Sequence, residues 1–326
     1  MNPKENALEI LKFGNPEYIQ KELPSITLAY TGVNHEGYTG GGHSCPVGSV
    51  WTDIWGTEWH KEHPDVMGFP KGNPLAEMEA FDSFVWPDPN DERICGKIYE
   101  IAERITDEDR RNRFVAGSHR DTLWEKSYML VGMENMMIYM FTEPEYAKKI
   151  FHKIMDFQLG IAEHYIKCGV EVITMSDDLG TQRALLMSKE LIEEFLIPEY
   201  RRLFDFYKKR GVKVHFHSCG HIEPILETFI ELGVDILNPV QATANDLSKV
   251  IEVTNKRMCI HGAISTALLE SGPTQAIDAE VKRVISLLGA NGGYFCAPDQ
   301  AMPIPKEHME AFYTALEKYG KYPLEK

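Results

Sequence analysis

From about residue 168 onward, the sequence alternates regularly between short apolar runs and longer helical stretches. The apolar runs are separated by segments with helical periodicity and occupy residues 170–175, 212–216, 234–240, 258–262 and 293–296. Strand, helix and strand in succession form the repeating unit of a parallel α/β fold. Together with less regular strands in the first half, this pattern predicts one (β/α)8 TIM-type barrel, a single domain over residues 1–326. A doubly wound sheet is the alternative, although its usual Gly-x-Gly-x-x-Gly signature does not follow an early strand.

The composition of the chain excludes several classes of function. Its formal net charge is −15 at pH 7, so no basic surface for nucleic acid is expected. The first residues contain no apolar signal core, and no later stretch approaches the roughly eighteen apolar residues of a membrane span. These features predict a cytoplasmic protein without a membrane partner. The six cysteines are scattered along the chain, which is unlike a secreted disulfide scaffold and leaves them as free thiols, core residues or metal ligands.

Polar side chains follow the ends of successive predicted strands. They are Asp177 and Asp178, His217 and Cys219, Asn238 and Gln241, His261, and Cys296 and Asp299. In a barrel all these strand ends meet at the C-terminal mouth, where such folds carry their chemistry. The recurrence of polar groups at this one position indicates an enzyme.

Three of these residues form a candidate metal site. His217 and Cys219 are two residues apart, so in an extended chain their side chains face the same side. Cys296 lies at the end of another predicted strand. Two thiolates and one imidazole are the ligands of a catalytic zinc ion that keeps its fourth position open. The alternative is that the cysteines are buried free thiols that only fill the core.

The pair Asp177 and Asp178 ends the strand at 170–175. One carboxylate of such a pair usually caps a helix or closes a turn. The other can reach the mouth as a catalytic acid or base, as a partner of His217, or as a fourth zinc ligand. We expect Asp178 to be catalytic, and Asp177 and His261 to contact substrate.

Tryptophans cluster around a carboxylate in the first half of the chain. Trp51, Trp55 and Trp59 lie within nine residues that also include Asp53. The segment is either a hairpin with buried tryptophans or an aromatic-walled pocket around Asp53. In the second interpretation Asp53 is catalytic and Trp55 binds substrate.

A glycine-rich stretch precedes this segment. Residues 31–48 include six glycines and His43, and the stretch follows Tyr30 at the end of a predicted strand. Such density of glycine predicts a mobile loop close to a ligand, and the loop is a candidate lid. We therefore expect Tyr30 and His43 to contact substrate.

Four segments carry a more specific signal. They are residues 176–182 (Ser-Asp-Asp-Leu-Gly-Thr-Gln), 217–220 (His-Ser-Cys-Gly), 238–241 (Asn-Pro-Val-Gln) and 292–298 (Gly-Gly-Tyr-Phe-Cys-Ala-Pro). These segments resemble the uroporphyrinogen decarboxylase superfamily, and the resemblance is strongest from about residue 120 onward. It implies a distorted (β/α)8 barrel.

Within that superfamily the chain is more similar to the zinc methyltransferase branch than to the decarboxylase. The decarboxylase grips porphyrinogen carboxylates with early arginines, and residues 1–40 contain no arginine. The decarboxylase also has an aspartate in its first third, and the resemblance implies that this residue matches Asp53. In the methyltransferase branch a His-x-Cys pair and a late cysteine bind zinc, and these match His217, Cys219 and Cys296.

The resemblance implies a methyltransferase that demethylates phenyl methyl ethers and passes the methyl group to cob(I)alamin. The chain has no Asp-x-His-x-x-Gly corrinoid motif, so a partner corrinoid protein is expected to supply the cobalamin. The tryptophan-rich segment and residues 177–182 favour this O-demethylase component, with a methoxylated aromatic substrate. The alternatives are a methyl-corrinoid:coenzyme M methyltransferase, a decarboxylase, or a sensor that keeps the barrel and the metal without catalysis. A homodimer is one option for the oligomeric state.

Overall fold

A sheet of seven parallel strands forms the centre of the computed structural model, which describes residues 1–64 and 66–324. Neighbouring strands follow the order β1-β5-β6-β7-β8-β9-β10, so each new strand is added beside the previous one. The strands are β1 (Ser25–Leu28), β5 (Phe114–His119), β6 (Val172–Ser176), β7 (Lys213–His217), β8 (Ile236–Val240), β9 (Cys259–Ile264) and β10 (Tyr294–Pro298). This one-way order excludes the doubly wound alternative, in which the strand order reverses at a switch point.

The two edges of the sheet are connected by the segment that leads into β1. Gln20 forms a parallel bridge with Phe295, and the backbone N–H of Cys296 donates to the carbonyl oxygen of Gln20 at 2.9 Å. A few residues later Ser25 pairs with Phe114 of β5. The sheet therefore curls into the distorted (β/α)8-type barrel that the sequence predicts, with a single bridge where a regular barrel has a longer strand pairing.

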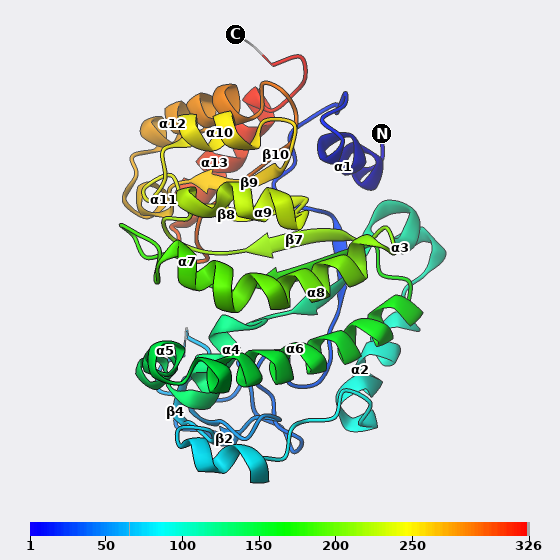
Figure 1. Cartoon of the computed structure of the whole chain (residues 1–326). Helices are drawn as coiled ribbons and strands as arrows, with labels where there is room; N and C mark the ends of the chain where they lie inside the picture. The colour runs from blue at the N-terminus through cyan, green and yellow to red at the C-terminus, as the bar shows by residue number, and fades with distance from the viewer. Residues whose placement is uncertain (65, 325–326) are drawn as a thin grey trace.

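Helices cover the outside of the barrel (Figure 1). The α-helices of the described residues are α1 (Pro3–Leu11), α2 (Glu92–Ala102), α3 (Asp107–Asn112), α4 (Trp124–Val131), α5 (Met133–Thr142), α6 (Pro144–Lys167), α7 (Lys189–Leu191), α8 (Ile197–Lys208), α9 (Leu226–Leu232), α10 (Leu247–Thr254), α11 (Thr266–Ser271), α12 (Thr274–Leu288) and α13 (Lys306–Tyr319). Two 3-10 helices are η1 (Met78–Ser83) and η3 (Glu223–Ile225), and η2 (Ile192–Leu196) is a π-helical segment before α8. Among the residues that the structure describes, no helix has the length and apolarity needed to cross a membrane.

Alternation along the strands separates an apolar outer layer from a polar interior. In β7, Val214 and Phe216 are fully buried beneath the helices, whereas Lys213, His215 and His217 are only half-buried. Successive side chains of a strand point to opposite faces, so the second set points into the barrel. The interior near the C-terminal end of β7 is therefore lined by groups that can do chemistry.

The opposite end of the barrel is closed by α1. Ala7 and Ile10 of this helix join a buried apolar cluster with interior side chains of five strands. The five strands contribute Phe114, Ala116, Val172, Ile236, Cys259 and Phe295. In Figure 1 the arrow of β7 points away from α1, so the C-terminal ends of the strands lie at the end of the barrel opposite α1.

A long connection between β1 and β5 contains a small second sheet. Its antiparallel strands are β2 (Val50–Thr52), β3 (Glu58–His60) and β4 (Phe69–Gly72). Trp51 of β2 pairs with Trp59 of β3, and their indole rings stack with centroids 6.3 Å apart. The tryptophan-rich segment is thus a hairpin extended by a third strand.

Candidate functional site

The loops that follow β6 and β7 touch each other at two glycines. Gly220 has a φ of +84°, and a Cβ atom there would lie 2.4 Å from the carbonyl oxygen of Gly180. A Cβ on Gly180 would in turn lie 2.7 Å from the carbonyl oxygen of Cys219. Only residues without a side chain permit this approach. The contact brings the residues just before Gly180 next to those just before Gly220.

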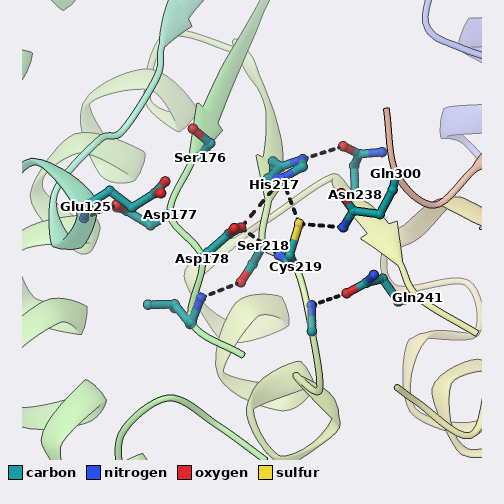
Figure 2. A network of polar contacts seen from close by, with 12 residues as sticks. Glu125, Ser176, Asp177, Asp178, His217, Ser218, Cys219, Asn238, Gln241 and Gln300 are labelled. Carbon is teal, nitrogen blue, oxygen red and sulfur yellow. Dashed lines mark hydrogen bonds and ion pairs between the residues drawn. The ribbon is translucent and has the colours of Figure 1, made fainter. Parts of the chain in front are cut away.

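This approach gathers three potential ligand atoms. Oxygen, nitrogen and sulfur atoms of Asp178, His217 and Cys219 all lie within 4.8 Å of one another. Sγ of Cys219 is 3.3 Å from Nε2 of His217, and Oδ1 of Asp178 is 3.6 Å from the same nitrogen. Figure 2 shows the three side chains converging from the ends of neighbouring strands. One neutral imidazole with a thiolate and a carboxylate fits the donor set of a zinc ion.

Hydrogen bonds from outside the group fix its geometry. Asn238, in the middle of β8, places Oδ1 2.8 Å from Nδ1 of His217, and Nε2 of Gln300 is 3.1 Å from Sγ of Cys219 (Figure 2). The backbone N–H of Cys219 also donates to Oδ1 of Asp178 at 2.9 Å. Neighbours of this kind orient the ligands of a metal and are needed for tight binding.

The group opens onto a cavity of about 540 Å³ at the barrel mouth. The side chains of His217 and Asp178 keep 39% and 44% of their surface exposed, so both can reach a bound molecule. The cavity is lined mainly by polar side chains: Asn34, Ser118, Arg120, Asp121, Glu125, Thr174, Ser176, Asp178, His215, His217 and Asn238, together with Met67 and Met175. Its size suits a small organic substrate.

Burial and neighbouring carboxyl groups raise the pKa of two side chains at this site, Glu125 and Cys219. Burial, together with the charges of Asp121, Asp177 and Asp178, raises the pKa of Glu125 to about 10. Glu125 therefore carries its proton at neutral pH. Burial likewise raises the pKa of the Cys219 thiol to about 12, with Asp178 adding to the effect. A bound cation would reverse the shift at Cys219, because a coordinating thiol is deprotonated.

Asp177 does not line the cavity and instead binds the first turn of α4. Its side chain is fully buried and accepts hydrogen bonds from the backbone N–H groups of Leu123 and Glu125, both at 2.8 Å, and from the Tyr200 hydroxyl at 2.6 Å. The first turn of α4 has no cap from its own chain segment, so this carboxylate satisfies its N–H groups. Asp177 thus positions α4 and does not contact the space where substrate would bind.

The structure does not bring Cys296 into the ligand group. Its side chain is completely buried on β10, on the same face as Tyr294 and among side chains of the outer apolar layer. The neighbouring Phe295 is the residue that points into the barrel. Alternation along the strand therefore turns Cys296 away from His217 and Cys219, and Asp178 takes the third place in the group.

Asp53 and Trp55 also lie away from the cavity. The Asp53 carboxylate is buried and accepts from the backbone N–H groups of Trp55 and Thr57 at 2.8 and 2.9 Å and from the Trp59 indole at 3.0 Å. Trp55 is buried and packs edge-on against Phe157. The segment corresponds to the hairpin interpretation and not to an aromatic-walled pocket.

The remaining predicted substrate contacts are likewise not part of the cavity wall. Tyr30 is buried against Phe157, and His43 is exposed in its loop, where its carbonyl oxygen accepts from Lys61. His261 lies in the barrel interior, with Nδ1 3.4 Å from Nε2 of His215. It is the predicted contact that comes nearest, since His215 itself lines the cavity.

Sequence reasoning missed several polar residues of the site, among them Glu125, Arg120 and Gln300. Glu125 and Arg120 line the cavity, and Gln300 contacts the Cys219 sulfur. Arg120 directly follows β5 and Gln300 comes two residues after β10, so the rule that strand ends carry chemistry points to both. Glu125 lies in the first turn of a helix and had no such signal.

The fold and the site together define a TIM-type α/β barrel with a candidate metal group at its C-terminal mouth. A solved methyltransferase from Methanosarcina mazei has this fold, with a TM-score of 0.71 over 98% of this chain and 99% of that chain at 16% sequence identity. Residues 66–319 match the family model "Uroporphyrinogen decarboxylase (URO-D)". The chain belongs to this family.

A curated relative provides a second comparison. The methylated-thiol–coenzyme M methyltransferase of Methanosarcina mazei is 25% identical over 204 residues, which cover 59% of this chain. The match spans about half of that relative, 51% of its length.

Proposed function

We propose that this protein is a zinc-dependent methyltransferase that demethylates phenyl methyl ethers and passes the methyl group to the cob(I)alamin of a partner corrinoid protein. Membership of the URO-D family and the names of the similar proteins support the methyltransferase class. The preference for an ether over a thiol rests on one observation, the place of Asp178 in the ligand group.

The donor set favours activation of oxygen. Asp178, His217 and Cys219 would hold the zinc, and the two anionic ligands would offset its charge, as two thiolates would. A carboxylate is a harder ligand than a thiolate and donates less electron density to the metal. When bound, zinc would supply Lewis-acid polarisation of the ether oxygen.

The protein side chains would perform the remaining tasks. Asn238 holds His217 so that Nε2 faces the centre of the group, and Gln300 donates a hydrogen bond toward Cys219. The cavity wall formed by Ser118, Thr174 and Ser176 offers hydroxyl groups to the substrate. These residues lie on β5 and β6 of the central sheet, which would orient the substrate before reaction. The partner that carries the corrinoid would approach the same mouth.

A thiol methyltransferase is the second candidate, because the curated relative carries that name. In that reaction a thiol or methylated thiol would occupy the same cavity. The two candidates differ in the atom bonded to the methyl group, oxygen or sulfur.

The test presents both classes of methyl donor to the zinc-loaded protein with photochemically reduced cobalamin. Formation of methylcobalamin is followed by its absorption spectrum. We expect methoxyarenes to react and methylated thiols to react far more slowly. The reverse preference would establish the thiol candidate, and no reaction with either donor would overturn the proposal. Heat-denatured protein serves as the control for uncatalysed transfer.

A further inference from the structure

Glu125 occupies a distinctive position in the cavity. It lies in the first turn of α4, where Asp177 holds its backbone N–H, and its side chain lines the same cavity as Asp178 and His217. The Tyr128 hydroxyl, one turn later on α4, donates to Oε1 of Glu125 at 3.2 Å. In Figure 2 Glu125 is drawn beside Asp177, and Asp178 lies between them and His217.

The surroundings of Glu125 are rich in negative charge. Asp121 from the end of β5 and Asp177 and Asp178 from the end of β6 all act on it, and the Tyr200 hydroxyl of α8 faces the same buried region. The neighbouring cation Lys126 points instead toward the Met129 sulfur and the Trp55 ring. Burial and nearby negative charges both disfavour the ionised form of a carboxyl group, so Glu125 retains its proton. For Glu125 burial is the largest cause of its raised pKa.

We propose that Glu125 is the general acid that protonates the phenolic oxygen as the ether is cleaved. This inference rests on the proposed function and adds a catalytic residue to it. A thiolate leaves without help at neutral pH, whereas a phenolate with a pKa near 10 is a poor leaving group. A neutral carboxyl group in the cavity wall therefore suits an ether better than a thioether.

Cleavage of the ether moves one methyl group and one proton. The bond between the methyl carbon and the ether oxygen breaks, and its electron pair stays on the oxygen. Cob(I)alamin of the partner supplies the electron pair for the new cobalt–carbon bond and is formally oxidised to the cobalt(III) state. The oxygen takes the proton of Glu125, so the product is a neutral phenol. Water in the cavity then returns a proton to the carboxylate.

The test compares Glu125→Gln with the wild-type protein on anisoles that differ only in a ring substituent. For methyl-substituted anisole we expect the variant to be slower by about 10²–10⁴-fold, the usual contribution of a general acid. For nitro-substituted anisole, whose phenol is more acidic, the loss should shrink toward none. Gln keeps an oxygen that accepts from Tyr128, so the fold and the zinc content should be unchanged. Glu134→Gln, at an exposed position on α5, is the matched control.

A second measurement does not depend on turnover. Infrared spectra of the zinc-loaded protein at pH 7 should contain a protonated-carboxyl band that loses the Glu125 component in Glu125→Gln and is unchanged in Glu134→Gln; the remainder comes from Asp177, whose pKa is raised to about 7 by burial. An equal loss of rate with both anisoles, or no change in the carboxyl band, would overturn the role of Glu125 and leave the proposed function intact. Failure of the wild-type protein to demethylate either anisole would overturn both.

Discussion

Oδ1 of Asn238 lies 2.8 Å from Nδ1 of His217. The amide oxygen can only accept, so Nδ1 carries the hydrogen and Nε2 presents its lone pair to Asp178 and Cys219. A residue of β8 thereby determines which nitrogen of an imidazole on β7 can bind a metal. The tautomer follows from this contact before any ion arrives.

Replacement of Asn238 by Leu should weaken zinc binding by about 10–100-fold, the usual effect of removing such a partner. Leu is close in size to Asn but accepts no hydrogen bond, so the ring loses its fixed tautomer. Competition with a chromophoric chelator measures the affinity. Asn238→Asp keeps an acceptor oxygen and should bind zinc at least as well as the wild type. Equal affinities of the Leu and Asp variants would contradict the argument.

The two cysteines of the sequence prediction should behave differently. Cys219→Ala removes a proposed ligand and should lose most of the bound zinc. Cys296→Ala leaves the ligand group unchanged and should retain about one zinc per chain. Metal analysis of the purified proteins, with circular dichroism to monitor folding, distinguishes the two. Folded but zinc-free Cys296→Ala would restore the ligand set expected from the sequence.

Asp178→Asn tests the oxygen ligand. The Asn side chain still accepts from the backbone N–H of Cys219, so the local loop should remain in place. The loss of one anionic ligand should weaken zinc binding, which isothermal titration of the metal-free protein measures. Unchanged affinity would show that Asp178 is not a ligand and would return it to the role of a substrate contact.

Asp53→Ala should affect stability and not the site. Three buried donors lose their acceptor, and each hydrogen bond to a charged group contributes roughly 1.5–3 kcal/mol. We expect the free energy of unfolding in urea to fall by about 2–5 kcal/mol, less than the sum because water can enter. Zinc content and the Michaelis constant for the ether should stay at wild-type values. A changed Michaelis constant in the folded variant would favour a pocket around Asp53.

The raised pKa of Glu125 also predicts a dependence of stability on pH. Its ordinary value is 4.5 and burial raises it to about 10 in the folded protein. Between these values the unfolded chain releases a proton that the folded chain retains, so this group's contribution to stability decreases as pH rises from 4.5 to 10. Glu125→Gln removes the effect. The melting temperature of the variant relative to the wild type should therefore be higher at pH 9 than at pH 5. A constant difference would mean that Glu125 is ionised in the folded state.

The barrel and part of the site could be predicted from the sequence because both follow from strand ends. Parallel strands place their C-termini together, so residues such as Asp178 and His217 had to be near each other once the strands were recognised. The sequence did not show that Cys296 lies outside the group of Asp178, His217 and Cys219, because the direction of a strand side chain depends on whether its position along the strand is odd or even. A shift of one residue moves every side chain of a strand to the opposite face of the sheet. An apolar run such as 293–296 has no alternation of polar and apolar residues, so the sequence does not show which side chains point into the barrel.

The tryptophan segment and Glu125 illustrate a second limit. The Asp53 carboxylate accepts hydrogen bonds from three donors within the next six residues. The sequence does not show that these hydrogen bonds form, and so it does not show that the carboxylate is unavailable to a substrate. The protonation of Glu125 arises first from burial and then from the charges of Asp121, Asp177 and Asp178, which follow the ends of two strands. Such properties belong to the assembled structure and cannot be read from a local pattern.

The bridge between Gln20 and Phe295 joins positions that are 275 residues apart in the chain. During synthesis the ribosome adds roughly 5–20 residues per second, so the partner of Gln20 is made on the order of tens of seconds after Gln20 itself. Until then one edge of the growing sheet has no neighbour and is open to pairing with other chains. The nascent protein thus passes through an interval in which chaperone protection of that edge would raise the yield of folded molecules.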